Sequence, residues 1–148
     1  MLDTTRKLFD DINDVISKLK DTGTDLSLLK AACAECIIIK LFAEVEKTLK
    51  RDILYNYLSN DRKKALDILT TDGHKIPRDL DKFIIKMHDV GTISDECMLS
   101  IKSLCGLRNS EIAHNPGLSQ TIPWESLDKY IQEAQHFLNG VKEYLEND

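Results

Sequence analysis

The sequence predicts an all-α protein, a single domain over residues 1–148 in which five to six helices form a bundle. The main evidence is the spacing of apolar residues, which recur with a helical rather than a strand period along almost the whole chain. Only three prolines and six glycines occur, so few positions interrupt this pattern. A chain of 148 residues is also long enough to bury a substantial core.

The first half of the chain predicts three helices. The first, within residues 1–22, ends at Gly23 and belongs either to the bundle or to a peripheral surface. The second begins near Asp25, and its apolar positions continue through Leu54 and Leu58 until residues 59–61 interrupt them. A shorter helix follows, with residues 65, 66 and 69 inward, before a polar loop at residues 70–75. The apolar stripe of the first helix consists of Leu8, Ile12, Val15, Ile16 and Leu19.

The second half predicts three more helical stretches. Pro77 suits the first turn of one helix, because its missing N–H would be unpaired there anyway, and Gly91 ends that helix. Ser94 is expected to cap the next helix, which the Asn-Pro-Gly turn at residues 115–117 should stop. Pro123 begins the last helix, whose apolar stripe extends from residue 124 to residue 145.

Charge and hydropathy exclude two classes of partner. The net charge is −5, and the basic residues at positions 62–64 are interleaved with Asp61 and Asp67, which argues against tight binding to duplex DNA. No apolar run approaches the roughly eighteen residues that a membrane span requires. Residues 1–7 lack the apolar stretch of a secretion signal. We therefore expect a cytoplasmic protein that contacts no membrane.

Cys33 and Cys36 form a Cys-x-x-Cys pair, a spacing that can bind a metal or carry redox chemistry. They lie inside a helical stretch without the Gly or Pro of a metal-binding knuckle, and residues three apart in a helix simply share a face. Cys97 and Cys105, eight residues apart, supply no second pair of this kind. We interpret all four as buried thiols and expect neither a metal nor a cofactor.

One segment combines residue types that act in catalysis: residues 108–114, which read Arg-Asn-Ser-Glu-Ile-Ala-His. An imidazole has an unperturbed pKa of about 6.5 and can move protons near neutral pH. A guanidinium is always charged, and its forked donors match phosphate oxygens. In a regular helix, Arg108 and His114 would lie about 120° apart. They can share a substrate only if the helix loosens near residues 115–117 or a second subunit contributes.

This segment resembles the signature of HEPN domains: an Arg, often followed by a polar residue such as Asn, which is Asn109 here, then four to six residues, then a His. The Ala113-His114 ending, the turn after it and the final helix near Trp124 look most like the abortive-infection subgroup. The family is an all-helical bundle, in agreement with the helices expected over about residues 25–148. The similarity of sequence is specific only over about residues 99–140.

Many HEPN proteins are metal-independent endoribonucleases, and the resemblance implies a homodimer in which two Arg/His motifs face each other. His114 would take the proton of an RNA 2′-hydroxyl as general base. Arg108 would stabilise the charge that builds on the phosphoryl oxygens, and Asn109 would orient one of these groups. The product would end in a 2′,3′-cyclic phosphate. Such a protein would act as a toxin or defence effector, with an antitoxin or regulatory protein as a further partner.

Two residues depart from the family pattern. In the toxin branch that pairs with a nucleotidyltransferase antitoxin, a modified Tyr lies two residues after the His, where this chain has Pro116. Glu111 also places a negative charge inside the motif, which would repel RNA unless it is paired or turned away. Two alternatives therefore stay open: a non-catalytic HEPN-like module that docks a partner protein or nucleotide, and an unrelated helical adaptor. In the adaptor, Arg108 would pair with Glu111 or Glu125, and His114 would only cap a helix.

Overall fold

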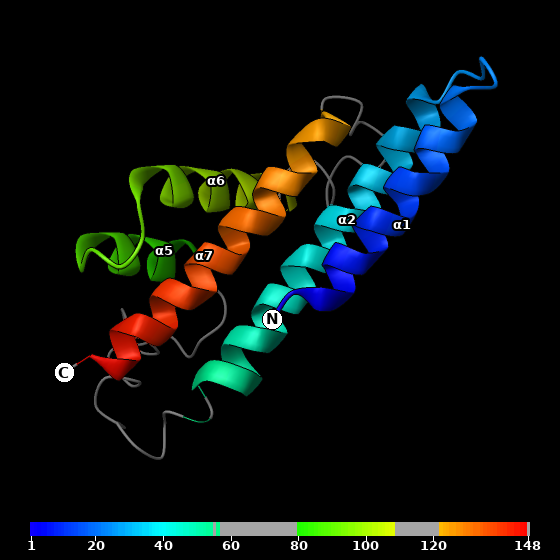
Figure 1. Ribbon diagram of the computed structural model, residues 1–148. Helices are drawn as coiled ribbons and strands as arrows, with labels where there is room; N and C mark the ends of the chain where they lie inside the picture. Colours follow the sequence, from blue (N-terminus) through cyan, green and yellow to red (C-terminus); the bar gives the residue numbers. More distant parts are fainter. Residues whose placement is uncertain (55, 57–79, 109–121, 148) are drawn as a thin grey trace.

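The computed structural model describes residues 1–54, 56, 80–108 and 122–147, and this part of the chain contains helices and turns but no strand (Figure 1). The prediction of an all-helical protein is confirmed. A π-helical turn, η1 (Thr48–Leu54), continues the second helix, and a 3-10 turn, η5 (Trp124–Ser126), precedes the last one. The α-helices are α1 (Asp3–Lys20), α2 (Ser27–Lys47), α5 (Leu80–Asp89), α6 (Asp95–Gly106) and α7 (Leu127–Glu146).

Helix α7 lies in the middle of the bundle. Figure 1 shows the antiparallel pair α1 and α2 on one side of α7, and the shorter pair α5 and α6 on the other. Fully buried side chains from three helices meet along it, among them Ile37 of α2, Ile101 of α6 and Phe137 of α7. Burial of one such side chain contributes about 1.5–3 kcal/mol, so these shared contacts hold the two pairs together.

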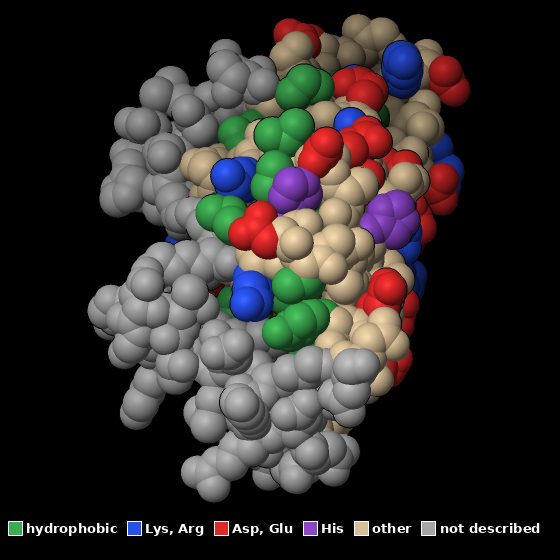
Figure 2. All heavy atoms as spheres, turned by 90° about the vertical axis from the view of Figure 1, so that its left-hand side faces the viewer, with side chains coloured by type: hydrophobic (Ala, Val, Ile, Leu, Met, Phe, Trp, Pro, Cys, Tyr) green, Lys and Arg blue, Asp and Glu red, His purple; other side chains and the backbone are tan. Residues whose placement is uncertain are grey.

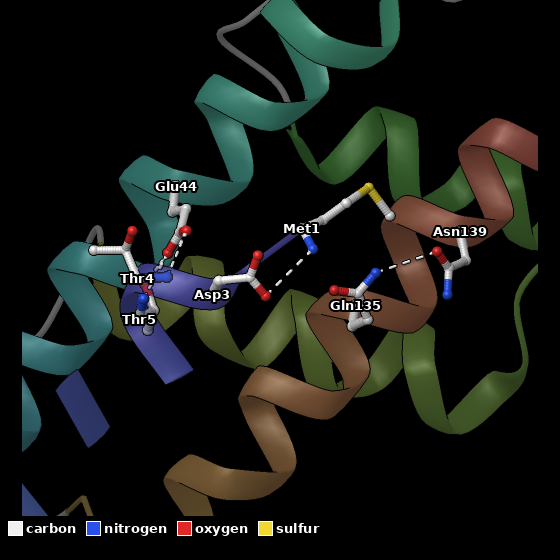
Figure 3. A network of polar contacts seen from close by, with 7 residues as sticks. All are labelled: Met1, Asp3, Thr4, Thr5, Glu44, Gln135 and Asn139. Atoms are coloured by element: carbon white, nitrogen blue, oxygen red, sulfur yellow. Dashed lines mark hydrogen bonds and ion pairs between the residues drawn. The ribbon is translucent and has the colours of Figure 1, made fainter. Parts of the chain in front are cut away.

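Helix α1 packs against the rest of the bundle through both its polar and its apolar residues. The carboxylate of Glu44 on α2 accepts hydrogen bonds from the backbone N–H of Thr4 (3.2 Å) and Thr5 (2.8 Å), and also from the Thr5 hydroxyl (Figure 3). The first N–H groups of a helix have no partner within it, so Glu44 caps α1 from the neighbouring helix. Further along α1, the ring of Phe9 stacks on Trp124, with 5.1 Å between centroids.

Several predicted helix ends are confirmed. Gly23 and Gly91 have φ angles of 72° and 81°, a left-handed conformation that glycine adopts without steric cost. The Ser94 hydroxyl accepts a hydrogen bond from the backbone N–H of Cys97 (3.1 Å), as expected of an N-cap. Helical structure continues to Leu54, as predicted. The predictions for residues 57–79 and for the turn at residues 115–117 lie outside the described residues.

The prediction that all four cysteines are buried was wrong for two of them. Cys97 and Cys105 are buried, but Cys33 is half-buried and Cys36 is exposed. Val15, assigned to an inward stripe, is also 53% exposed. For the two cysteines the reason is that α2 carries apolar residues around its whole circumference, so apolar spacing alone does not reveal which of its faces packs inward.

None of the described helices has the length and apolar character needed to cross a bilayer.

Candidate functional site

Arg108 lies just beyond α6, where Leu107 still has helical backbone angles. Its side chain is exposed, and its guanidinium carbon Cζ lies 4.8 Å from the centroid of the Phe42 ring on α2. Attraction between a cation and an aromatic face positions the guanidinium without using one of its N–H donors. Because Phe42 is itself only 7% exposed, the ring is a rigid support for the charge.

The other residues predicted for the site, Asn109 and His114, lie outside the described residues, as does Glu111. Of the three predicted catalytic residues, the structure therefore describes only Arg108. It adds Phe42, which the sequence did not indicate as part of the site. The two residues are 66 positions apart, so no local pattern could have revealed their contact.

The charge around Arg108 is mixed. Glu46 follows Phe42 by one helical turn on α2, a spacing that puts the two side chains on the same flank of the helix. Figure 2 shows acidic and basic side chains intermingled on one face of the molecule, and its coloured residues form no broad basic patch. A site at Arg108 would therefore attract an anion through a local charge rather than through an extended positive surface.

A pocket of about 310 Å³, lined by both polar and apolar side chains, lies between the start of α1 and the side of α7. Arg6 and His136 both line it, together with Gln132 and Gln135. However, Arg6 forms an ion pair with Asp128, and His136 Nδ1 lies 3.4 Å from the carboxylate of Glu133. Both of these possible cations have acidic partners. The pocket therefore offers no cation that lacks an acidic partner to a phosphate.

The neighbouring contacts at this end of the molecule are structural. Figure 3 shows the Met1 amino group directed toward Asp3, with 3.8 Å between nitrogen and oxygen, and the Gln135 amide directed toward Asn139. No local sequence pattern indicates this pocket, because Arg6 and His136 are 130 residues apart.

The buried thiol of Cys97 is chemically inactive. Its Sγ donates a hydrogen bond to the backbone carbonyl of Glu133 (3.3 Å). Burial, reinforced by the nearby Glu133 carboxylate, raises the pKa of Cys97 to about 12. Burial and the neighbouring Cys36 also raise the pKa of Cys33. The thiolate is the form of cysteine that acts as a nucleophile or binds a metal. Because the raised pKa values keep Cys33 and Cys97 protonated, neither residue is suited to these roles.

The described residues contain no group of three or more His, Cys, Asp or Glu side chains placed to hold a metal ion. Two of the four histidines are described, and each contacts carboxylates instead. His88 binds Asp95 at the junction of α5 and α6 and lies 3.7 Å from Asp89, while His136 contacts Glu133. Trp124 also has a structural role, because it is buried and its indole N–H donates a hydrogen bond to the Asn13 side chain (3.0 Å).

Comparison with known proteins found no matching family model, no matching curated protein and no matching solved structure.

Proposed function

We propose that this protein is a cytoplasmic, metal-independent endoribonuclease of the HEPN type that acts as a homodimer. Arg108, Asn109 and His114 carry the chemistry. The observation that carries the proposal is the position of Arg108, whose exposed guanidinium is held on the Phe42 ring at the point where the motif begins. The all-helical fold of the described residues is compatible with this family.

Cleavage follows from the chemistry of the two ionisable groups. His114 removes the proton of a 2′-hydroxyl, and the resulting oxygen attacks the adjacent phosphorus. The bond to the 5′ oxygen breaks, and this oxygen takes up a proton from water, which leaves a 2′,3′-cyclic phosphate on one fragment and a 5′-hydroxyl on the other. Arg108 stabilises the negative charge on the phosphoryl oxygens during the attack. Asn109 orients the phosphate or the imidazole through hydrogen bonds, and no metal takes part.

The surface charge limits the class of RNA. With a net charge of −5 and intermingled acidic and basic side chains, the protein neutralises few phosphates. We expect it to bind a short single-stranded stretch, and its affinity should fall only weakly as salt increases. Its cellular role is that of a toxin or defence effector, with an antitoxin or regulatory protein as its partner.

The decisive experiment is RNA cleavage in excess EDTA. Wild-type protein should cut single-stranded RNA and leave cyclic phosphate ends, while Arg108→Ala and His114→Ala should lose the activity without unfolding. Two variants serve as matched controls: Lys102→Ala, which removes an exposed positive charge from α6, and His136→Ala, which removes an exposed imidazole. Both should keep full activity. Equal activity in wild type and both motif variants would overturn the proposal.

A second function is favoured by a separate observation. Helix α2 exposes a row of apolar side chains, as expected of a helical interaction module without catalysis. In that case Arg108→Ala and His114→Ala would leave every measurable activity unchanged, whereas substitutions on α2 would abolish partner binding.

A further inference from the structure

A second pocket, of about 310 Å³, lies at the end of the bundle where α7 begins (Figure 1). Side chains from α1, the start of α2, the η5 turn and the first turn of α7 line it. It shares no residue with the pocket beside His136. Its volume falls within the range of cavities that hold small organic molecules, so the groups that line it define which molecule it suits.

Two lysines line this pocket and have no ion-pair partner in the described part of the chain. Lys20 is the last residue of α1, and Lys30 lies in the first turn of α2. Neither ammonium has an acidic side chain of residues 1–54, 56, 80–108 or 122–147 within ion-pair distance. Two cations at one small pocket attract an anionic group, and a phosphate offers oxygens to both of them.

Uncharged donors line the same pocket. The side-chain oxygen of Asn13 accepts the indole N–H of Trp124 (3.0 Å), which leaves the amide N–H groups of Asn13 for a ligand. Ser17 is exposed, and its hydroxyl forms no hydrogen bond with another described residue. These donors suit a ligand that carries acceptor oxygens in addition to its anionic group.

The two carboxylates of the pocket differ in their availability. Asp128 pairs with Arg6 and also accepts a hydrogen bond from the Gln132 amide (3.0 Å), so its charge is already compensated. Glu125 is exposed and pairs with no cation among the described residues. Its carboxylate repels a bare phosphate, but it accepts hydrogen bonds from hydroxyl groups. The pocket therefore favours a molecule that combines a phosphate with hydroxyls.

We infer that this pocket binds a sugar phosphate. The phosphate contacts Lys20 and Lys30, and the sugar hydroxyls donate to Glu125. The stack of Phe9 on Trp124, with 5.1 Å between ring centroids, forms an apolar wall for the C–H groups of the sugar ring. Neither inorganic phosphate nor an unphosphorylated sugar satisfies both kinds of group.

This pocket is separate from the proposed nuclease motif and does not depend on RNA cleavage. Lys30 and Phe42, the ring under Arg108, are twelve residues apart on α2, which is about 18 Å along the helix. The two sites therefore have different side chains and can be altered independently.

Trp124 is the only tryptophan of the chain, so its fluorescence reports on this pocket. Titration with glucose 6-phosphate or ribose 5-phosphate should change the fluorescence in a saturable manner. Equilibrium dialysis with the radiolabelled sugar phosphates should give the same dissociation constants. Glucose, ribose and inorganic phosphate, each of which lacks one of the two groups, should bind at least about tenfold more weakly.

Lys20→Gln and Lys30→Gln should each weaken sugar phosphate binding about two- to fivefold, because each removes one exposed ion pair with the phosphate. Lys18→Gln is the matched control, since Lys18 is an exposed lysine of α1 that does not line the pocket. It should leave the dissociation constant unchanged.

Glu125→Ala should affect two probes in opposite directions. Inorganic phosphate should bind more tightly, because a repulsive charge is removed. The sugar phosphate should bind more weakly, because its hydroxyls lose their acceptor. Glu125 is exposed in a short turn, so circular dichroism should show an unchanged fold.

Failure of both sugar phosphates to bind in fluorescence and in dialysis would overturn the inference. Equal losses in Lys18→Gln and Lys20→Gln, or tighter binding of both probes to Glu125→Ala, would do the same. AMP carries the same ribose phosphate, and AMP binding that is tighter than that of ribose 5-phosphate would assign the pocket to a nucleotide instead. Arg108→Ala should bind the sugar phosphate as wild type does, and a loss of binding there would place the ligand at Arg108 rather than in this pocket.

Discussion

The guanidinium of Arg108 lies over the ring of Phe42, and this cation–π contact joins the segment just after α6 to the C-terminal part of α2. The ring is buried and the charge is exposed, so the contact fixes a cation at the protein surface. Phe42 therefore contributes to the proposed site as a positioning residue.

Phe42→Leu should reduce RNA cleavage about two- to fivefold, because it removes a contact worth about 0.5–1 kcal/mol but keeps an apolar side chain in the core. The measurement is kcat on a short RNA, with the product ends identified as above. Phe137→Leu is the control, since it removes a fully buried ring from α7. It should lower stability and leave kcat unchanged. An unaltered kcat in Phe42→Leu would show that the ring does not position Arg108.

Glu44→Ala should destabilise the fold by about 1–3 kcal/mol, because it removes the acceptor for two backbone N–H groups and for the buried Thr5 hydroxyl. Urea unfolding followed by circular dichroism measures the change. Glu143→Ala, an exposed carboxylate on α7, should shift the midpoint very little. Equal midpoints for the two variants would show that Glu44 does not cap α1.

Gly140→Ala should cost about 1–3 kcal/mol, because α7 passes too close to the turn before α6 to admit a side chain. An added Cβ would lie 2.5 Å from Ile93 Cγ2 and 2.9 Å from the carbonyl oxygen of Thr92. Gly106→Ala is the matched control, since its Cβ would meet nothing within 4 Å. Chemical denaturation should give Gly140→Ala a clearly lower free energy of unfolding than wild type. The free energy of unfolding of Gly106→Ala should equal or exceed that of wild type.

The raised pKa of Cys97 predicts a loss of stability at alkaline pH. Between its ordinary value of 9.0 and about 12, the thiol ionises in the unfolded chain but stays neutral in the folded one. Stability from this group is therefore complete below pH 9 and is lost as the pH rises toward 12. The urea midpoint of wild type should fall more steeply over this range than that of Cys97→Ala. Parallel curves for the two proteins would contradict the prediction.

The sequence predicted the local features of the fold well. Helix ends depend on residues close together in the chain, so the roles of Gly23, Gly91 and Ser94 followed from the conformational preferences of those residue types. The exposure of Cys36 did not follow, because α2 has apolar residues on every side and its neighbours come from distant segments. Only the packing of α1, α6 and α7 decides which of its faces is buried.

The candidate site was predictable in its residue types but not in its surroundings. The motif at residues 108–114 could be found from the sequence, because an arginine and a histidine are suited to act on a phosphodiester wherever they lie in a fold. Phe42 could not be found, because a phenylalanine in an apolar helix indicates a core position and nothing about the cation above it. The pocket beside Arg6 and His136 was missed for the same reason, since it forms only where the start of α1 packs against α7.

The central place of α7 has a consequence for biosynthesis. This helix separates the α1–α2 pair from the α5–α6 pair, yet the ribosome makes it after all of them (Figure 1). Most of the contacts that join the two pairs run through α7, so their shared core is completed only when this last helix has been made.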